Sequence, residues 1–101
     1  MLESVYEEIL SYELLKNNLE VKRQQPIPVV YETVKLDLGF RSDLIVENKV
    51  IVEIKSIEAL APVHFKQVLT HLTLTGLKLG LLVNFNEALI KNGMHRIVNK
   101  L

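Results

Sequence analysis

The apolar positions at the start of the chain recur with the spacing of an amphipathic helix. They are Leu2, Val5, Tyr6, Ile9, Leu10 and Leu14, and Asn17-Asn18 follows them as a stop signal. No serine, threonine, aspartate or asparagine precedes this helix as a capping residue. We therefore expect the natural chain to begin upstream of Met1.

The next part of the chain has the pattern of strands. Residues 29–36 alternate apolar and polar side chains, which predicts a half-buried strand, and residues 24–28 are expected to be an extended segment before it. Gly39 marks the turn that follows. Residues 40–46 and 50–55 are rich in Val, Ile and Leu and are separated by three polar residues, which predicts a β-hairpin.

The second half of the chain predicts a helix and then a strand. Pro62 suits the first turn of a helix, the helical spacing continues to residue 75, and Gly76 suits its C-terminal cap. Residues 79–85 form an apolar run typical of a buried strand, whereas residues 90–98 fit either a strand or a helix. This order of elements predicts one α+β or mixed α/β domain, with a single mixed sheet flanked by helices.

Composition narrows the possible functions. A chain of 101 residues supports one core, and it has no cysteine, which excludes disulfides, zinc–thiolate sites and a thiol nucleophile. The 12 basic and 12 acidic residues balance, so any contact with phosphates must come from a local patch. No signal peptide and no apolar stretch long enough to span a bilayer is recognisable, so we expect a cytoplasmic location and no membrane contact.

The predicted hairpin brings two acidic residues together. A three-residue loop at 47–49 puts Asp43 opposite Glu53 and Arg41 opposite Lys55, whereas a two-residue turn would shift this register by one. Opposed carboxylates repel each other, and a cation such as Mg²⁺, protonation of one acid or access to solvent would relieve the repulsion. A solvated face with cross-strand ion pairs is the alternative interpretation.

The chain resembles the PD-(D/E)XK nuclease superfamily in three motifs. They are Arg41-Ser42-Asp43-Leu44, then Glu53-Ile54-Lys55 with nine residues between Asp43 and Glu53, and Gln67-Val68-Leu69-Thr70-His71, which is similar to a Gln-x-x-x-Tyr motif. Within that superfamily the chain is similar to the GxxExxY family. The similar segments are Leu2-Glu3-Ser4-Val5-Tyr6-Glu7, Leu-Thr-Gly at 74–76 and Leu-Leu-Val-Asn-Phe at 81–85.

The resemblance covers nearly the whole chain and implies an αβββαβ restriction-endonuclease-like core over residues 1–101. Two positions depart from the family pattern. Ser42 stands where the motif has proline, and His71 stands where the glutamine motif has tyrosine. The glycine of the family motif would precede Met1, so the chain is expected to lack an upstream N-terminal helix.

The resemblance also implies a metal site and its catalytic residues. Asp43, Glu53 and the backbone carbonyl of Ile54 would hold Mg²⁺ or Mn²⁺. Lys55 would hold or activate the attacking water and stabilise charge on the phosphate, or else be a surface lysine paired with Asp43. Glu3, in preference to Glu7, would approach the site from the first helix, although an acid near a helix N-terminus is also favoured by the helix dipole.

Other polar residues have weaker indications. Gln67 would orient a water or a backbone group, and His71 would either touch phosphate or belong, with His64, to a polar stripe between helix and sheet. Tyr6 is expected in the core. Four basic residues are candidate phosphate contacts, although each also fits ordinary solvated charge: Lys22, Arg23, Arg41 and Lys66.

The predicted function is a metal-dependent nuclease that hydrolyses phosphodiester bonds, of DNA rather than RNA. The alternative is a catalytically inactive module of the same fold that binds nucleic acid or protein. Because the net charge is zero, we expect a homodimer or a partner protein to help grip the nucleic acid.

Overall fold

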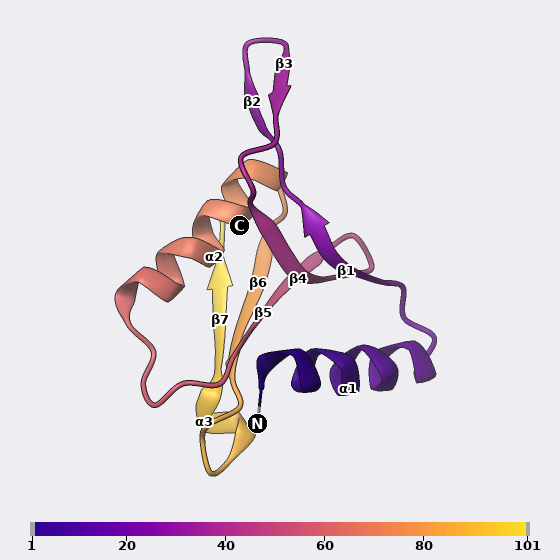
Figure 1. The fold of residues 1–101 in the computed structure, drawn as a ribbon, viewed down its shortest axis with the longest axis vertical. Coiled ribbons are helices and arrows are strands. Elements are labelled where there is room, and N and C mark those ends of the chain that lie inside the picture. The colour runs from indigo at the N-terminus through magenta and orange to yellow at the C-terminus, as the bar shows by residue number, and fades with distance from the viewer. Residues whose placement is uncertain (1, 101) are drawn as a thin grey trace.

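The computed structural model describes residues 2–100, which form a five-stranded mixed sheet flanked by helices (Figure 1). The elements in chain order are α1 (Glu3–Lys16), β1 (Val21–Pro26), β2 (Val29–Tyr31), β3 (Val34–Leu36), β4 (Arg41–Val46), β5 (Val50–Lys55), α2 (Pro62–Thr75), β6 (Leu79–Asn84), α3 (Ile90–Gly93) and β7 (Met94–Val98). The strand order is β1-β4-β5-β6-β7, and only the β5–β6 pair is parallel. The predicted single mixed sheet with flanking helices is confirmed.

Strand alternation divides the core into two apolar clusters, one on each face of the sheet. The cluster under α1 contains Leu44, Val52, Ile54 and Val83, with Tyr6, Leu10 and Leu14 packed against it. The cluster under α2 contains Ile51, Val68, Leu72 and Leu82. Strand β5 supplies residues to both clusters, which is why nearly all of its sequence is apolar and why a charged residue within it is notable.

Helix α1 buries only part of its predicted apolar face. Tyr6 stacks on Phe85 with ring centroids 4.4 Å apart, so the inner side of the helix is fixed to the sheet. The outer side remains open: Leu2, Val5 and Ile9 are exposed, although their spacing is the same as that of the buried positions. The helical period therefore predicted the helix correctly but not which of its apolar residues would be covered.

The first strand of the sheet is not the one that the sequence pattern predicts. Residues 24–28 were expected to be an extended segment, but Val21–Pro26 forms β1, an edge strand that pairs with β4. Residues 29–36 were expected to be one strand, and they instead form the β2–β3 hairpin, which projects from the domain (Figure 1). The hairpin turns at Glu32, whose φ is +57°, and no glycine or asparagine marks that turn in the sequence.

The later elements follow the predictions closely. Helix α2 begins at Pro62 and ends at Thr75, and Gly76 follows with the left-handed φ of +78° expected of a C-terminal cap. Strand β6 lies where the apolar run predicts it. The ambiguous residues 90–98 contain both a short helix, α3, and a strand, β7. Within residues 2–100 no helix is long and apolar enough to cross a membrane.

The predicted hairpin register is present in its first three residue pairs. Val46 pairs with Val50, as a three-residue loop requires, and the pairs of Ile45 with Ile51 and Leu44 with Val52 follow. Pairing was expected to continue to Asp43–Glu53 and Arg41–Lys55, but the β4–β5 ladder stops at Leu44–Val52. Beyond that point the backbone of β4 pairs with β1, and the Asp43 side chain still bonds to the backbone of β5 at Ile54.

Candidate metal centre

Asp43 lies on β4 just beyond the last residue paired with β5. Its Oδ2 accepts a hydrogen bond from the backbone N–H of Ile54 at 2.8 Å, and its Oδ1 accepts one from the side-chain amide of Gln24 at 3.3 Å. Burial and, second, the nearby negative charge of Glu53 raise the pKa of Asp43 to about 6, although these two hydrogen bonds act in the opposite direction. Asp43 is therefore an acid in an environment that disfavours its charge.

Glu53 lies in β5 and is only 4% exposed. Its Oε1 is 3.1 Å from Nδ1 of His71, which comes from α2 and is 1% exposed. The ring of Phe40 packs edge-on against the His71 ring, with centroids 6.1 Å apart. A carboxylate buried this deeply needs a polar partner, and the histidine provides it.

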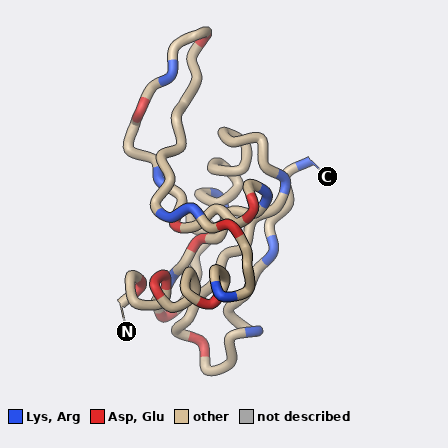
Figure 2. The backbone as a smooth tube through the Cα atoms, turned by 90° about the vertical axis from the view of Figure 1, so that its right-hand side faces the viewer, with Lys and Arg blue, Asp and Glu red and all other residues tan. Residues whose placement is uncertain are grey.

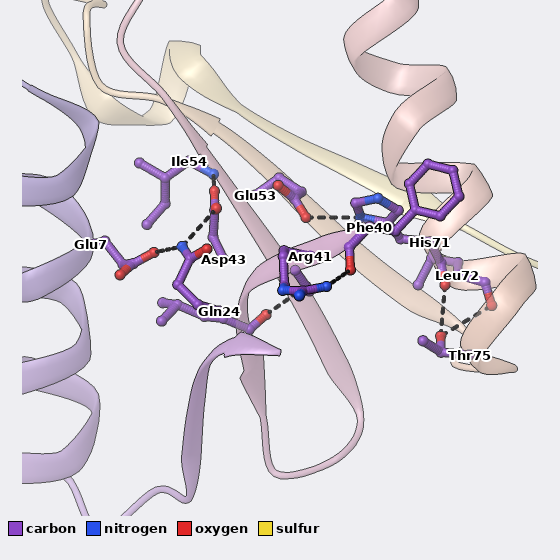
Figure 3. Close-up of polar contacts among 12 residues, drawn as sticks. Glu7, Gln24, Phe40, Arg41, Asp43, Glu53, Ile54, His71, Leu72 and Thr75 are labelled. Atoms are coloured by element: carbon purple, nitrogen blue, oxygen red, sulfur yellow. Dashed lines mark hydrogen bonds and ion pairs between the residues drawn. The ribbon is translucent and has the colours of Figure 1, made fainter. Parts of the chain in front are cut away.

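The two acids of the predicted metal pair thus turn to different helices (Figure 3). Glu53 points to His71 on α2, whereas Asp43 points to Gln24 and the side of α1. A cavity of about 360 Å³ adjoins Asp43 and does not reach Glu53. Its walls are formed by Glu3, Ser4, Glu7, Gln24, Asp43 and Ile54.

Helix α1 brings two further acids to this cavity. Glu7 is buried, and its Oε2 lies 2.9 Å from the guanidinium of Arg23 on β1. Glu3, the acid preferred by the sequence interpretation, accepts a hydrogen bond from the backbone N–H of Ser56 at 3.0 Å, just after the end of β5. The structure therefore brings both Glu3 and Glu7 to the same cavity as Asp43, and Glu7 is the more deeply buried.

The remaining predicted site residues are less closely gathered. Lys55 is half-buried at the end of β5, and within residues 2–100 its side chain makes no ion pair. Gln67 is exposed on α2, and none of the hydrogen bonds recorded for residues 2–100 involves its side chain. His64 has a structural role, because its Nδ1 accepts a hydrogen bond from the Ala61 N–H at the start of α2.

The basic residues proposed as phosphate contacts are engaged within the protein or dispersed over it. Arg41 bonds to Asp37 and to the Phe40 carbonyl, and Lys22 bonds to the side chain of Asn48. Figure 2 shows that Lys and Arg positions are interspersed with Asp and Glu positions along the backbone of residues 2–100. This distribution along the backbone agrees with the 12 basic and 12 acidic residues of the sequence.

Two contacts that shape the centre were not predicted from the sequence. Gln24 lies in a polar edge strand, and only the pairing of β1 with β4 reveals that it is opposite Asp43. The Glu53–His71 contact joins residues separated by 18 positions on different elements. The histidine in the tyrosine position of the glutamine motif was the available sequence signal for this second contact.

The donors at the cavity fit a hard divalent cation in chemical type. They are carboxylate oxygens, which Mg²⁺ and Mn²⁺ prefer. The pKa of Asp43 is raised by burial and, second, by the charge of Glu53, so a cation beside this carboxylate would stabilise its ionised form. Within the part of the chain that the structure describes, no three His, Cys, Asp or Glu side chains are already gathered around one point. The pairing of Glu53 with His71 contributes to this, because it turns the Glu53 carboxylate away from Asp43.

The chain belongs to the PD-(D/E)XK nuclease superfamily, because the family model matches residues 1–97. PD-(D/E)XK nucleases generally use divalent metal ions. No curated protein gives a significant match to the chain. The narrower GxxExxY assignment remains a prediction from the motifs.

Two solved structures have a similar fold. The crystal structure of SSO0001 has a TM-score of 0.69 and 22% identity over 98% of this chain and 51% of its own. The alkaline exonuclease LHK-Exo from Laribacter hongkongensis has a TM-score of 0.61 and 17% identity over 96% of this chain and 56% of its own. This chain therefore spans about half the length of either protein, and the likeness concerns the fold.

Proposed function

We propose that this chain is a metal-dependent nuclease that hydrolyses phosphodiester bonds, with DNA as its substrate. The observation that carries the proposal is the state of Asp43. Its carboxylate is held by the Ile54 amide at the edge of an acidic cavity, with its pKa raised by burial and by Glu53. Perturbed acids in a concave site are typical of functional centres. Membership of a nuclease superfamily and the fold shared with an alkaline exonuclease support the same assignment.

In this proposal Asp43, Glu53 and the Ile54 carbonyl hold Mg²⁺ or Mn²⁺, and Glu3 or Glu7 orients a water beside it. The bound cation would polarise a phosphate oxygen and lower the pKa of a water. Glu53 would have to exchange some of its contact with His71 for this role, since its Oε1 now faces the ring. The half-buried position of Lys55 at the end of the same strand supports a role for it near the phosphate.

The proposed chemistry assigns each remaining residue a simple task. Lys55 places a positive charge near the phosphate, where negative charge grows as the oxygen of water bonds to phosphorus. The attacking water gives up a proton to solvent, the bond from phosphorus to the leaving oxygen breaks, and that oxygen takes up a proton from solvent. Gln67, exposed on α2, would orient substrate or water, because its amide is free to donate and accept.

An inactive module that keeps the fold is the second candidate. It is favoured by the Glu53–His71 pair, because a deeply buried acid already satisfied by a ring is less available to a cation. Such a module would bind nucleic acid or protein without turnover. Under either candidate the dispersed positive charge favours a homodimer or a partner protein as an aid to binding.

A nuclease screen separates these candidates. The chain is incubated with Mn²⁺ or Mg²⁺ and with single- and double-stranded DNA and RNA, beside Asp43→Asn and Asp37→Asn variants. Asp37 is the matched control, because it is an exposed aspartate outside the cavity. The proposal predicts cation-dependent cleavage of DNA that is lost in Asp43→Asn and kept in Asp37→Asn. Cation binding without cleavage of any of the four substrates would instead support the inactive module.

A further inference from the structure

Gln24 has an unusual backbone conformation for a strand residue. Its neighbours pair regularly with β4, Arg23 with Leu44 and Gln25 with Ser42, so Gln24 falls opposite Asp43. Its φ is +49°, which lies in the left-handed region of the backbone. Residues other than glycine, asparagine and aspartate rarely adopt this conformation. Such a residue persists only where its surroundings hold it in place, and here a specific set of side-chain contacts does so.

The side chain of Gln24 joins two acids from different elements. Its amide nitrogen donates to Oε1 of Glu7 on α1 at 2.5 Å and to Oδ1 of Asp43 on β4 at 3.3 Å (Figure 3). A primary amide nitrogen carries two hydrogens, which is the number that these two acceptors require. All three side chains line the same cavity.

The amide is well suited to keep two carboxylates close without neutralising them. It brings the positive end of a dipole to both oxygens but adds no net charge, so the pair remains attractive to a cation. Arg23, the preceding residue, instead directs its full charge to the other oxygen of Glu7 and to Glu8. Arg23 thus anchors α1 through ion pairs, whereas the Gln24 side chain lines the cavity.

We propose that Gln24 is a positioning residue of the metal centre: when no metal is bound, its amide occupies the space between Asp43, a ligand of the cation in the proposed function, and Glu7, which would orient the water beside that cation. This inference rests on the proposed function, because it assumes that a divalent cation binds at Asp43. By linkage, a contact that stabilises the metal-free protein and must be given up on binding lowers the affinity for the cation. Removing the amide therefore tightens cation binding.

The test uses Gln24→Gly and Gln24→Met in the full chain. Glycine adopts the left-handed backbone without strain, so Gln24→Gly removes the amide and its two hydrogen bonds but also relieves the backbone strain at this position. Methionine keeps the length of the side chain and cannot donate to the acids. Gln25→Met is the matched control, since the Gln25 amide donates to the Arg23 carbonyl and does not line the cavity.

The measurements are calorimetric titration with Mn²⁺ and the Mn²⁺-induced shift of the melting temperature. Both Gln24 variants should bind Mn²⁺ about tenfold more tightly than the parent, which corresponds to about 1.4 kcal/mol. Gln25→Met should bind as the parent does. A parent that binds Mn²⁺ while both Gln24 variants bind equally or more weakly overturns the inference alone. A parent that binds no Mn²⁺ overturns the proposed metal centre, and this inference with it.

Discussion

Asp43 and Glu53 lie on neighbouring strands, yet their surroundings differ. Glu53 is almost fully buried, and the ring of His71 provides its hydrogen-bond partner. Asp43 is half-buried among acids, is held by neutral donors, and has a pKa raised to about 6. Glu53 thus has a hydrogen-bond partner within the protein, whereas the carboxylate of Asp43 would be stabilised by a positive charge placed beside it. We therefore expect a cation to be attracted to Asp43 first, and the position of the Glu53 side chain to depend on His71 of α2.

The largest expected effect is that of replacing Lys55, the basic residue that lies on β5 together with Glu53. If the acids hold the cation, Lys55 acts on the transition state, and Lys55→Ala should lower kcat about 10²–10³-fold, or about 3–4 kcal/mol, on a substrate that the parent cleaves. The cation-induced melting shift should persist, and intrinsic stability should change by less than about 1 kcal/mol. Lys55→Arg should rescue little, because a planar fork does not place charge as a compact ammonium does. Lys49→Ala is the control, because Lys49 lies on the exposed β4–β5 loop. If Lys55→Ala cleaved the substrate at the parent rate, Lys55 would have no role in the mechanism.

His71→Ala tests whether Glu53 really depends on α2. The substitution leaves a buried carboxylate without its partner and removes the packing of Phe40 on the ring, so the free energy of unfolding should fall by about 3 kcal/mol. Urea denaturation measures this change. Adding Glu53→Gln to His71→Ala should restore part of the loss, since the two residues are in contact. A loss below about 1 kcal/mol would show that Glu53 is satisfied elsewhere and is free to turn to Asp43.

Asp43→Asn tests the other acid through the dependence of stability on pH without added metal. The pKa of Asp43 is raised from its ordinary value near 3.8 to about 6, so the folded state holds the proton to higher pH than the unfolded state does. Stability should therefore fall as pH rises from about 4 to about 6 and stay reduced above that. After a discount for partial exposure, the penalty is about 1–2 kcal/mol, and Asp43→Asn should remove it.

The same variant should lose the melting shift caused by Mn²⁺ or Mg²⁺. A flat melting temperature of the parent between pH 4 and 6, or a cation shift that survives in Asp43→Asn, contradicts the contrast drawn between the two acids. Asp37→Asn serves again as the control, because Asp37 lies outside the cavity.

The smallest expected effect is that of Gln67→Ala. Gln67 is exposed on α2, and alanine is a better helix former, so stability should change by less than about 0.5 kcal/mol. If Gln67 orients substrate or water, kcat/KM should fall about threefold, as expected for one weak neutral hydrogen bond. Thermal melting and the cleavage assay measure the two quantities. An unchanged kcat/KM would mean that α2 contributes to the site only through the contact of His71 with Glu53.

The elements that the sequence predicts well carry their signals locally. Pro62 and Gly76 mark the ends of α2, and the short polar loop after β4 determines the register of Val46 with Val50. Strand β1 escapes prediction because most of its residues are polar and its identity depends on pairing with β4. The β2–β3 turn was not predicted, because its residue with left-handed φ is Glu32 and not a glycine or an asparagine.

The candidate site divides in the same way. Strand alternation and register predicted which residues would lie near each other, and Asp43 does experience the charge of Glu53. They could not predict where the carboxylates turn, because those directions depend on Gln24 and His71, which lie 19 and 18 positions away along the chain. The periodicity of a sequence predicts which side chains of one element share a face. It does not predict which residue of another element each side chain will contact.

The loosely covered helix α1 has a consequence for the order in which the molecule assembles. The β4–β5 hairpin closes over a short loop and α2–β6 follows it along the chain, whereas the contact of Glu7 with Gln24 depends on the docking of the first helix. Contacts between segments close in sequence tend to form early, and helices with few covered side chains tend to detach first. Helix α1 has no side-chain cap at its start and leaves much of its apolar surface open. The acidic cavity is thus completed at a late step of folding, and amide exchange should show it opening while the sheet beneath stays protected.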